Sequence, residues 1–426
     1  MLKILKEIFS FLCLTSLLFF SFAFGKDKSI LVLDPKLKFL ILDVLRNSNY
    51  IKSKKLELEA VKLEKKSVER QKGPTLSFST SVSYKKNYLL KVKNWEANLP
   101  VSLSFILSYK LFDPSYNSKI KLSDISYKTQ KINYLREKIS LEYTFLNIYL
   151  DYLRLLDTLQ IEKENLNLTK QIYSFAQKKY KLGFLSQDEL INYLIFLKDK
   201  EKNIENLNYQ IKEKIILLRS YLGKNDIPTI KLKTLPNMFD IPSQNLDKKL
   251  LLISISERNT KIELLKSKLK PSIDMDLSAS STKDFKQDIS SAVSFSVGLS
   301  FNWLIFDNFQ TKYQILKEDK EILSLKAQIK DVEKNFYTTL EKDKINILAL
   351  KREYELQKRL VKLYKEIFKI KRHKFESGQI SLEKLLDAQK NYLNARKLKL
   401  NLFYQIWEKY FNYLKDANID LIKFLN

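Results

Sequence analysis

The sequence predicts a mainly α-helical protein with a smaller β-barrel portion, built from two copies of the pattern strand, strand, long helix, turn and helix. Three observations predict this fold class. Glycine and proline are absent from four long intervals, one turn sequence occurs twice, and four segments alternate apolar with polar residues. Together these features account for nearly all of the chain that follows the first 25 residues.

Four intervals that lack glycine and proline predict long helices. They are rich in Leu, Lys, Glu and Ile, which favour helix, and they span 115–182, 186–222, 309–377 and 381–416. The first and third would each extend about 100 Å at the rise of an α-helix. The first also carries two apolar seams, one through Leu135 and Ile139 and one through Leu141 and Phe145. Two seams indicate that this helix packs against neighbours on two sides.

The segment YKLGFLSQDEL, which begins at Tyr180, predicts a tight turn between the first two helices. Gly183 can adopt the left-handed conformation that ends a helix. Ser186 can cap the next helix, and Glu189, three residues later, completes a capping box. Leu185 precedes the cap and pairs with Leu190 as a hydrophobic staple.

The segment FESGQISLEKL, which begins at Phe375, repeats this turn between the third and fourth helices. It keeps Gly378, the capping Ser381, and the staple of Ile380 with Leu385, but Lys384 replaces the capping glutamate. The strands repeat as well, since VSLSFILSYKLFD from Val101 aligns with FSVGLSFNWLIFD from Phe295. We therefore divide the chain into a first repeat over 26–243 and a second over 244–426.

Four strands are predicted from the alternation of apolar and polar residues. They cover 75–84, 101–111, 272–281 and 295–305, a length that crosses a bilayer when tilted. Tyr109 and Trp303 lie near strand ends, where aromatic membrane girdles occur. Four strands are too few to close a barrel, and an open edge in lipid leaves backbone groups unsatisfied. A membrane location therefore requires several chains to share one barrel, whereas a soluble sheet with one buried face remains the alternative.

Residues 1–25 have the organisation of a secretory signal peptide. Lys3 and Lys6 precede an apolar run over 8–22, and Ala23-Phe24-Gly25 supplies a small-x-small cleavage site. The run is shorter than the roughly 20 residues of a membrane-spanning helix. We expect cleavage after Gly25, which also removes the single cysteine of the chain.

The composition argues against catalysis. The chain has 6 Gly, 1 Cys and 1 His, whereas phosphate and metal sites need glycine-rich loops or clusters of His, Cys and carboxylates. His373 has no partner histidine or cysteine, so we interpret it as a residue of the helix surface. The net charge of +27 comes from lysines spread along helical faces. We expect no enzyme, no cofactor, no metal and no nucleic acid partner.

Several stretches resemble the outer membrane efflux protein family, whose archetype is TolC. They are HKFESGQISLEKLLDAQKNYLNARKLKL from His373, KYKLGFLSQDEL from Lys179, LFDPS and IFDN before the long helices, and SYLG ending at Gly223. The resemblance implies a homotrimer whose four-stranded sheets close a 12-stranded barrel in the outer membrane, continuous with a helical tunnel in the periplasm. It implies passive conduction of exported substrates in a tripartite efflux or type I secretion system.

The resemblance also assigns functional positions. The two tip turns would dock a periplasmic adaptor protein, which works with an inner membrane pump, and their docking residues would be Gly183, Leu185, Ser186, Gly378, Ile380 and Ser381. Lys384 and Asp387 occupy the positions that family members use for an acidic constriction of the tunnel entrance. A periplasmic coiled-coil scaffold or adaptor that never enters a membrane is the alternative, although it leaves the four strands unexplained.

Overall fold

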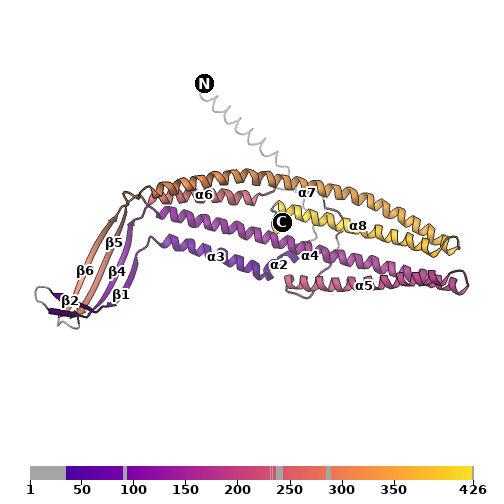
Figure 1. The fold of residues 1–426 in the computed structure, drawn as a ribbon, viewed down its shortest axis with the longest axis horizontal. Coiled ribbons are helices and arrows are strands. Elements are labelled where there is room, and N and C mark those ends of the chain that lie inside the picture. The colour runs from indigo at the N-terminus through magenta and orange to yellow at the C-terminus, as the bar shows by residue number, and fades with distance from the viewer. Residues whose placement is uncertain are drawn as a thin grey trace, which may run out of the picture.

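The chain forms an elongated molecule with a β-sheet at one end and two helical tips at the other (Figure 1). The computed structural model describes residues 35–89, 94–230, 232, 234–236, 243–284 and 289–424. The signal peptide predicted over 1–25 lies outside the described residues.

Two antiparallel helical hairpins provide most of the length of the molecule (Figure 1). They consist of α4 (Tyr116–Lys181) with α5 (Gln187–Leu222) and α7 (Gln310–Glu376) with α8 (Leu382–Asp416). Each helix begins and ends within one residue of the interval that lacks glycine and proline. Because α4 packs against α3, α5, α6 and α8, it needs apolar side chains on more than one side.

Shorter helices lie beside the long ones and were not predicted from the sequence. They are α2 (Pro35–Asn47), α3 (Asn49–Arg70), α6 (Leu246–Ser267) and the terminal α9 (Leu421–Phe424). Helix α3 packs on α4, and α6 packs on α7. Because α3 and α6 precede the first strand of their repeats, each repeat begins with a helix. The signal was available, since Ser48 and Asn245 cap α3 and α6 by accepting backbone N–H groups.

The sheet is antiparallel and joins the two repeats at its centre. Its strands are β1 (Thr75–Val82), β4 (Pro100–Phe112), β5 (Ser272–Asp284) and β6 (Ile289–Asn302), in the order β1-β4-β5-β6. Among the described residues, β1 and β6 each have one neighbouring strand and form the edges. A separate hairpin of β2 (Lys85–Leu89) and β3 (Asn94–Asn98) lies between β1 and β4 in sequence and was also not predicted.

The fourth strand differs from the range 295–305 expected from its alternation. Strand β6 begins earlier, at Ile289, and ends at Asn302, which pairs with Ser272 at the start of β5. Pro271 precedes Ser272 and has no N–H to continue the ladder. The pairing therefore stops there, and Trp303 lies beyond the strand. The first strand likewise ends at Val82, not at residue 84, before the chain enters β2.

The hydrophobic core lies among the helices and has two parts. The larger cluster joins α2, α4, α5 and α8 in the middle of the molecule, and its fully buried side chains include Tyr143, Phe145, Tyr410 and Phe411. The smaller cluster lies near the tips and includes Ala176, Tyr193, Phe375 and Leu385. In the described part of the chain, none of the helices combines the length and apolar character needed to cross a bilayer.

Candidate functional site

The first tip turn has the backbone that its sequence predicts. Gly183 has a φ of 76°, and its N–H donates to the carbonyl of Tyr180 at 2.9 Å. The N–H of Phe184 donates to the carbonyl of Lys179 at 2.9 Å, which completes the helix-ending pattern. Ser186 and Glu189 form the predicted capping box, in which Ser186 Oγ accepts the Glu189 N–H at 3.2 Å.

The second tip turn repeats this backbone with a weaker cap. Gly378 has a φ of 79°, and the N–H of Gln379 donates to the carbonyl of Lys374 at 2.7 Å. Ser381 Oγ accepts the N–H of Lys384 at 3.5 Å. Lys384 offers no carboxylate to return a hydrogen bond, so the second turn lacks the reciprocal half of the capping box.

Of the predicted docking residues, the glycines and serines are exposed at the two apices, whereas Leu185 and Ile380 are half-buried. Leu185 and Ile380 pack against the tip cluster that contains Tyr193 and Phe375. Their apolar side chains therefore contribute to joining each turn to the helices behind it.

Lys384 and Asp387 lie on one face of α8 and are exposed. The adjoining face of the helix carries the buried Leu385 and Ala388. Arg372, a basic residue near this position, pairs with Glu376 at 3.0 Å. The single chain thus leaves Lys384 and Asp387 side by side on a surface that faces away from its own core.

The two faces of the sheet differ in chemistry. The apolar face is exposed, and Phe295 and Val297 have exposed fractions of 81% and 73%. The polar face carries pairs of serines from neighbouring strands whose hydroxyl oxygens lie 2.6–2.8 Å apart: Ser79 with Ser104, Ser81 with Ser102, Ser278 with Ser296, and Ser280 with Ser294. Each pair joins residues that face each other in register, so the pairs stabilise the pairing of β1 with β4 and of β5 with β6.

The predicted girdle residues lie at the end of the sheet nearest the helices. Tyr109 is half-buried on β4 and pairs in register with Met275 of β5. Trp303, just beyond β6, is exposed, and its indole N–H donates to the carbonyl of Leu269 at 3.0 Å. That hydrogen bond ties the Trp303 ring to the segment between α6 and β5.

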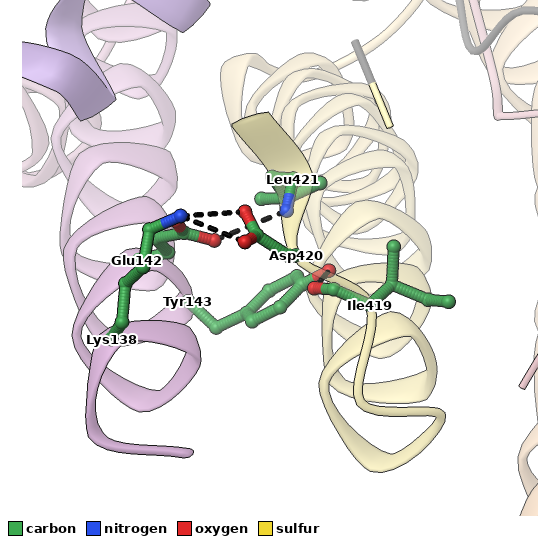
Figure 2. A network of polar contacts seen from close by, with 6 residues as sticks. All are labelled: Lys138, Glu142, Tyr143, Ile419, Asp420 and Leu421. Carbon is green, nitrogen blue, oxygen red and sulfur yellow. Dashed lines mark hydrogen bonds and ion pairs between the residues drawn. The ribbon is translucent and has the colours of Figure 1, made fainter. Parts of the chain in front are cut away.

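A buried charge network joins α4 to the C-terminal segment 417–424, as Figure 2 shows. Glu142 Oε2 accepts the backbone N–H of Leu421 at 3.1 Å. Lys138 Nζ lies 2.8 Å from Asp420 Oδ2 and 3.5 Å from Glu142 Oε1. Glu142 has an exposed fraction of 0%, and this burial raises the pKa of its carboxyl to about 7, against the opposing charge of Lys138.

Tyr143 anchors the same segment from the next position of α4. Its side chain is fully buried, and its hydroxyl donates to the carbonyl of Ile419 at 3.1 Å (Figure 2). The apolar seam predicted through Leu135 and Ile139 continues to Tyr143, and sequence reasoning overlooked the charges beside it. The available signal was the spacing of Lys138 and Glu142, which lie four residues apart on either side of the seam residue Ile139.

A second buried network joins three helices near the tips. Gln389 of α8 donates from Nε2 to Asn165 Oδ1 at 3.0 Å and to Thr169 Oγ1 at 2.7 Å, both on α4. Gln389 Oε1 accepts the hydroxyl of Tyr193 on α5 at 2.9 Å. One amide therefore connects both hairpins.

We expect Gln389→Leu to lower the free energy of unfolding by about 1–3 kcal/mol, because Asn165 and Tyr193 then keep polar atoms in the core without their partner. Thermal unfolding followed by circular dichroism at a fixed protein concentration measures the change. Gln379→Leu, at the exposed second tip, is the control and should be close to neutral. Equal effects of the two substitutions would contradict the role given to the network.

Residues 251–410 match the family model described as Outer membrane efflux protein. None of the curated protein sequences compared with the chain matches it. The matched residues cover most of the second repeat, from α6 through the sheet strands and the second hairpin.

Solved structures share the fold along the chain. CusC, described in work on transmembrane channel formation, has a TM-score of 0.79 and 16% identity, with 93% of this chain and 95% of CusC covered. The Campylobacter jejuni CmeC outer membrane channel has a TM-score of 0.75 and 15% identity, with 90% and 85% covered. The Vibrio cholerae outer membrane protein VceC has a TM-score of 0.75 and 12% identity, with 90% and 96% covered. The predicted resemblance to the outer membrane efflux protein family is therefore confirmed by the match over residues 251–410, and the fold is that of these outer membrane channels.

Proposed function

We propose that the chain is the outer membrane channel of a tripartite efflux or type I secretion system, and that three copies form its exit duct. Substrates pass through it passively, since the energy is spent elsewhere in the assembly. The observation that carries the proposal is a four-stranded sheet with one exposed apolar face, one serine-lined face and two edges, attached to helices about 100 Å long.

The sheet supports a shared barrel for two physical reasons. An exposed face that carries Phe295 and Val297 is unfavourable in water and favourable in lipid. Strand edges are excluded from lipid unless they are paired. Pairing β6 of one copy with β1 of the next satisfies both edges, and three four-stranded sheets give a barrel of 12 strands. The serine face then lines an aqueous lumen.

The helices then extend into the periplasm. In a trimer, six tip turns form the end of the tunnel that lies away from the barrel, and a periplasmic adaptor docks there to connect the channel to an inner membrane pump. The exposed Gly183, Ser186, Gly378 and Ser381 are at the apices that the adaptor meets.

Lys384 and Asp387 are the residues we assign to the tunnel entrance. They share an exposed face of α8, next to the tip cluster. Three lysines beside three aspartates give a mixed ring of charge, so the entrance has a weaker preference for cations than a purely acidic ring would have.

Conductance of the detergent-purified protein in planar bilayers, with a salt gradient, tests the proposal. We expect discrete conductance steps and a trimer in solution. A folded, helical protein that washes from membranes without detergent and never inserts would instead support a periplasmic scaffold.

Two neighbouring residues of β6 provide a sharper test. Val297→Lys places a charge on the apolar face and should cost about 2–4 kcal/mol per copy in the barrel, which prevents insertion. Ser296→Lys places the same charge on the serine face, so the channel should form and its reversal potential should move toward anion preference. A soluble sheet exposed to water would tolerate Val297→Lys and Ser296→Lys alike.

A further inference from the structure

The two tip turns share a backbone and differ in the side chains beside their glycines. Leu182 and Phe184 flank Gly183 in the first turn and have exposed fractions of 70% and 77%. The equivalent residues in the second turn, Ser377 and Gln379, are polar and also exposed. The second turn can therefore be used to decide which side chains of the first turn are needed for the turn itself.

Turn formation does not explain the two apolar side chains. The second turn makes the same backbone hydrogen bonds with serine and glutamine in their place. In the first turn, the contact with the core is made by Leu185, which packs against the tip cluster. Leu182 and Phe184 therefore expose apolar surface at the apex for a reason outside the fold of the single chain.

The charges around Leu182 and Phe184 are of both signs, because Asp188 is exposed in the first turn of α5. Lys178 and Lys181 are exposed in the last turn of α4, directly before Leu182. Lys179 is already engaged, since it contacts the carbonyl of Phe375 and lies 4.6 Å from the centre of the Phe375 ring. A surface that fits this apex has an apolar pocket whose rim carries acidic groups opposite Lys178 and Lys181 and a basic group opposite Asp188.

We propose that Leu182 and Phe184 form an apolar knob that inserts into such a pocket at the end of the periplasmic adaptor, and that the first tip turn carries most of the docking energy. This inference rests on the proposed function. The apolar contact with the adaptor is then made by the exposed Leu182 and Phe184. The half-buried Leu185 and Ile380 pack against the protein's own core instead. The second turn contributes polar contacts at the same apex.

Exchange of the flanking residues between the turns tests the knob. The double variant Leu182→Ser and Phe184→Gln gives the first turn the second turn's side chains and keeps Gly183, so the fold should be retained. We expect it to bind the purified adaptor of the same cell at least about tenfold more weakly than the unaltered trimer. Ser377→Ala with Gln379→Ala is the matched control, and it should change binding less than about threefold.

Photo-crosslinking separates this inference from the proposed function. The photoreactive residue p-benzoylphenylalanine is placed at position 184 or at position 379 in the full-length protein in cells, and the products are identified by mass spectrometry. Crosslinks to the adaptor that are strong at 184 and weak at 379 support the knob. Adaptor crosslinks at 379 alone, crosslinks from 184 to a second copy of this chain, or unchanged binding by the exchange variant would overturn it. If neither position reaches an adaptor, the proposed function fails as well.

Discussion

Lys138→Met is expected to lower the free energy of unfolding by about 3–5 kcal/mol at neutral pH, because it removes the cation that Glu142 and Asp420 share inside the protein. Both carboxyl side chains are at least nine-tenths buried, so solvent cannot replace the lost cation. The loss of stability should be smaller at lower pH, because Glu142 is then protonated and no longer needs the cation. Thermal or urea unfolding at pH 8 and pH 5 measures the loss of stability and its change with pH.

Lys121→Met is the matched control for the Lys138 variant. Lys121 pairs with Glu263 at 2.8 Å, but the Lys121 and Glu263 side chains are more than half exposed. Solvent screens that pair, so its removal should change stability by less than about 1 kcal/mol. Similar losses in the two variants would show that burial of the network contributes little.

Stability of the helical part is expected to fall as the pH rises from 5 to 8. The pKa of Glu142 is about 7 in the folded chain and about 4.5 in the unfolded chain. Between these values the folded chain binds more protons, so the extra stability is fully present below about 4.5 and is lost as the pH passes 7. The difference corresponds to about 3 kcal/mol.

Glu142→Gln should remove most of this pH dependence, since glutamine can still accept the N–H of Leu421 but carries no charge. Above pH 7 the variant should be at least as stable as the unaltered protein. Some dependence should persist at lower pH, because burial also raises the pKa values of Asp343 and Asp416. If the Glu142→Gln variant keeps the full dependence of the free energy of unfolding on pH between 5 and 8, that dependence comes from other groups.

The long hairpins could be predicted from sequence because their boundaries are set by residues with strong local preferences. Gly183 and Gly378 adopt the left-handed conformation that few other residues tolerate, and Ser186 and Ser381 cap the helices that follow. The strands were found to within three residues at every end except the start of β6, which lies six residues before the predicted one. Strand ends depend on the partner strand. The end of β6 at Asn302 is set by Pro271, which directly precedes the partner strand β5.

The buried networks could not be predicted because they depend on contacts between distant segments. Glu142 meets Leu421, and Gln389 meets Asn165, only after the helices have packed. The exposure of Phe184 could not be predicted either. The staple pattern identifies Leu185 as a packing residue, but it says nothing about the adjacent Phe184, which is exposed.

Helices α4 and α7 each run without a break from the sheet end to a tip (Figure 1). A rotation of either helix as a rigid body therefore moves its two ends in opposite directions. The large core cluster and the C-terminal segment lie near the middle of that length, where such a rotation would be centred. With about 50 Å of helix on either side of that centre, a tilt of about three degrees displaces the tip by about 2.5 Å. For straight helices, a small change of packing near Glu142 would therefore produce a larger displacement at the apices.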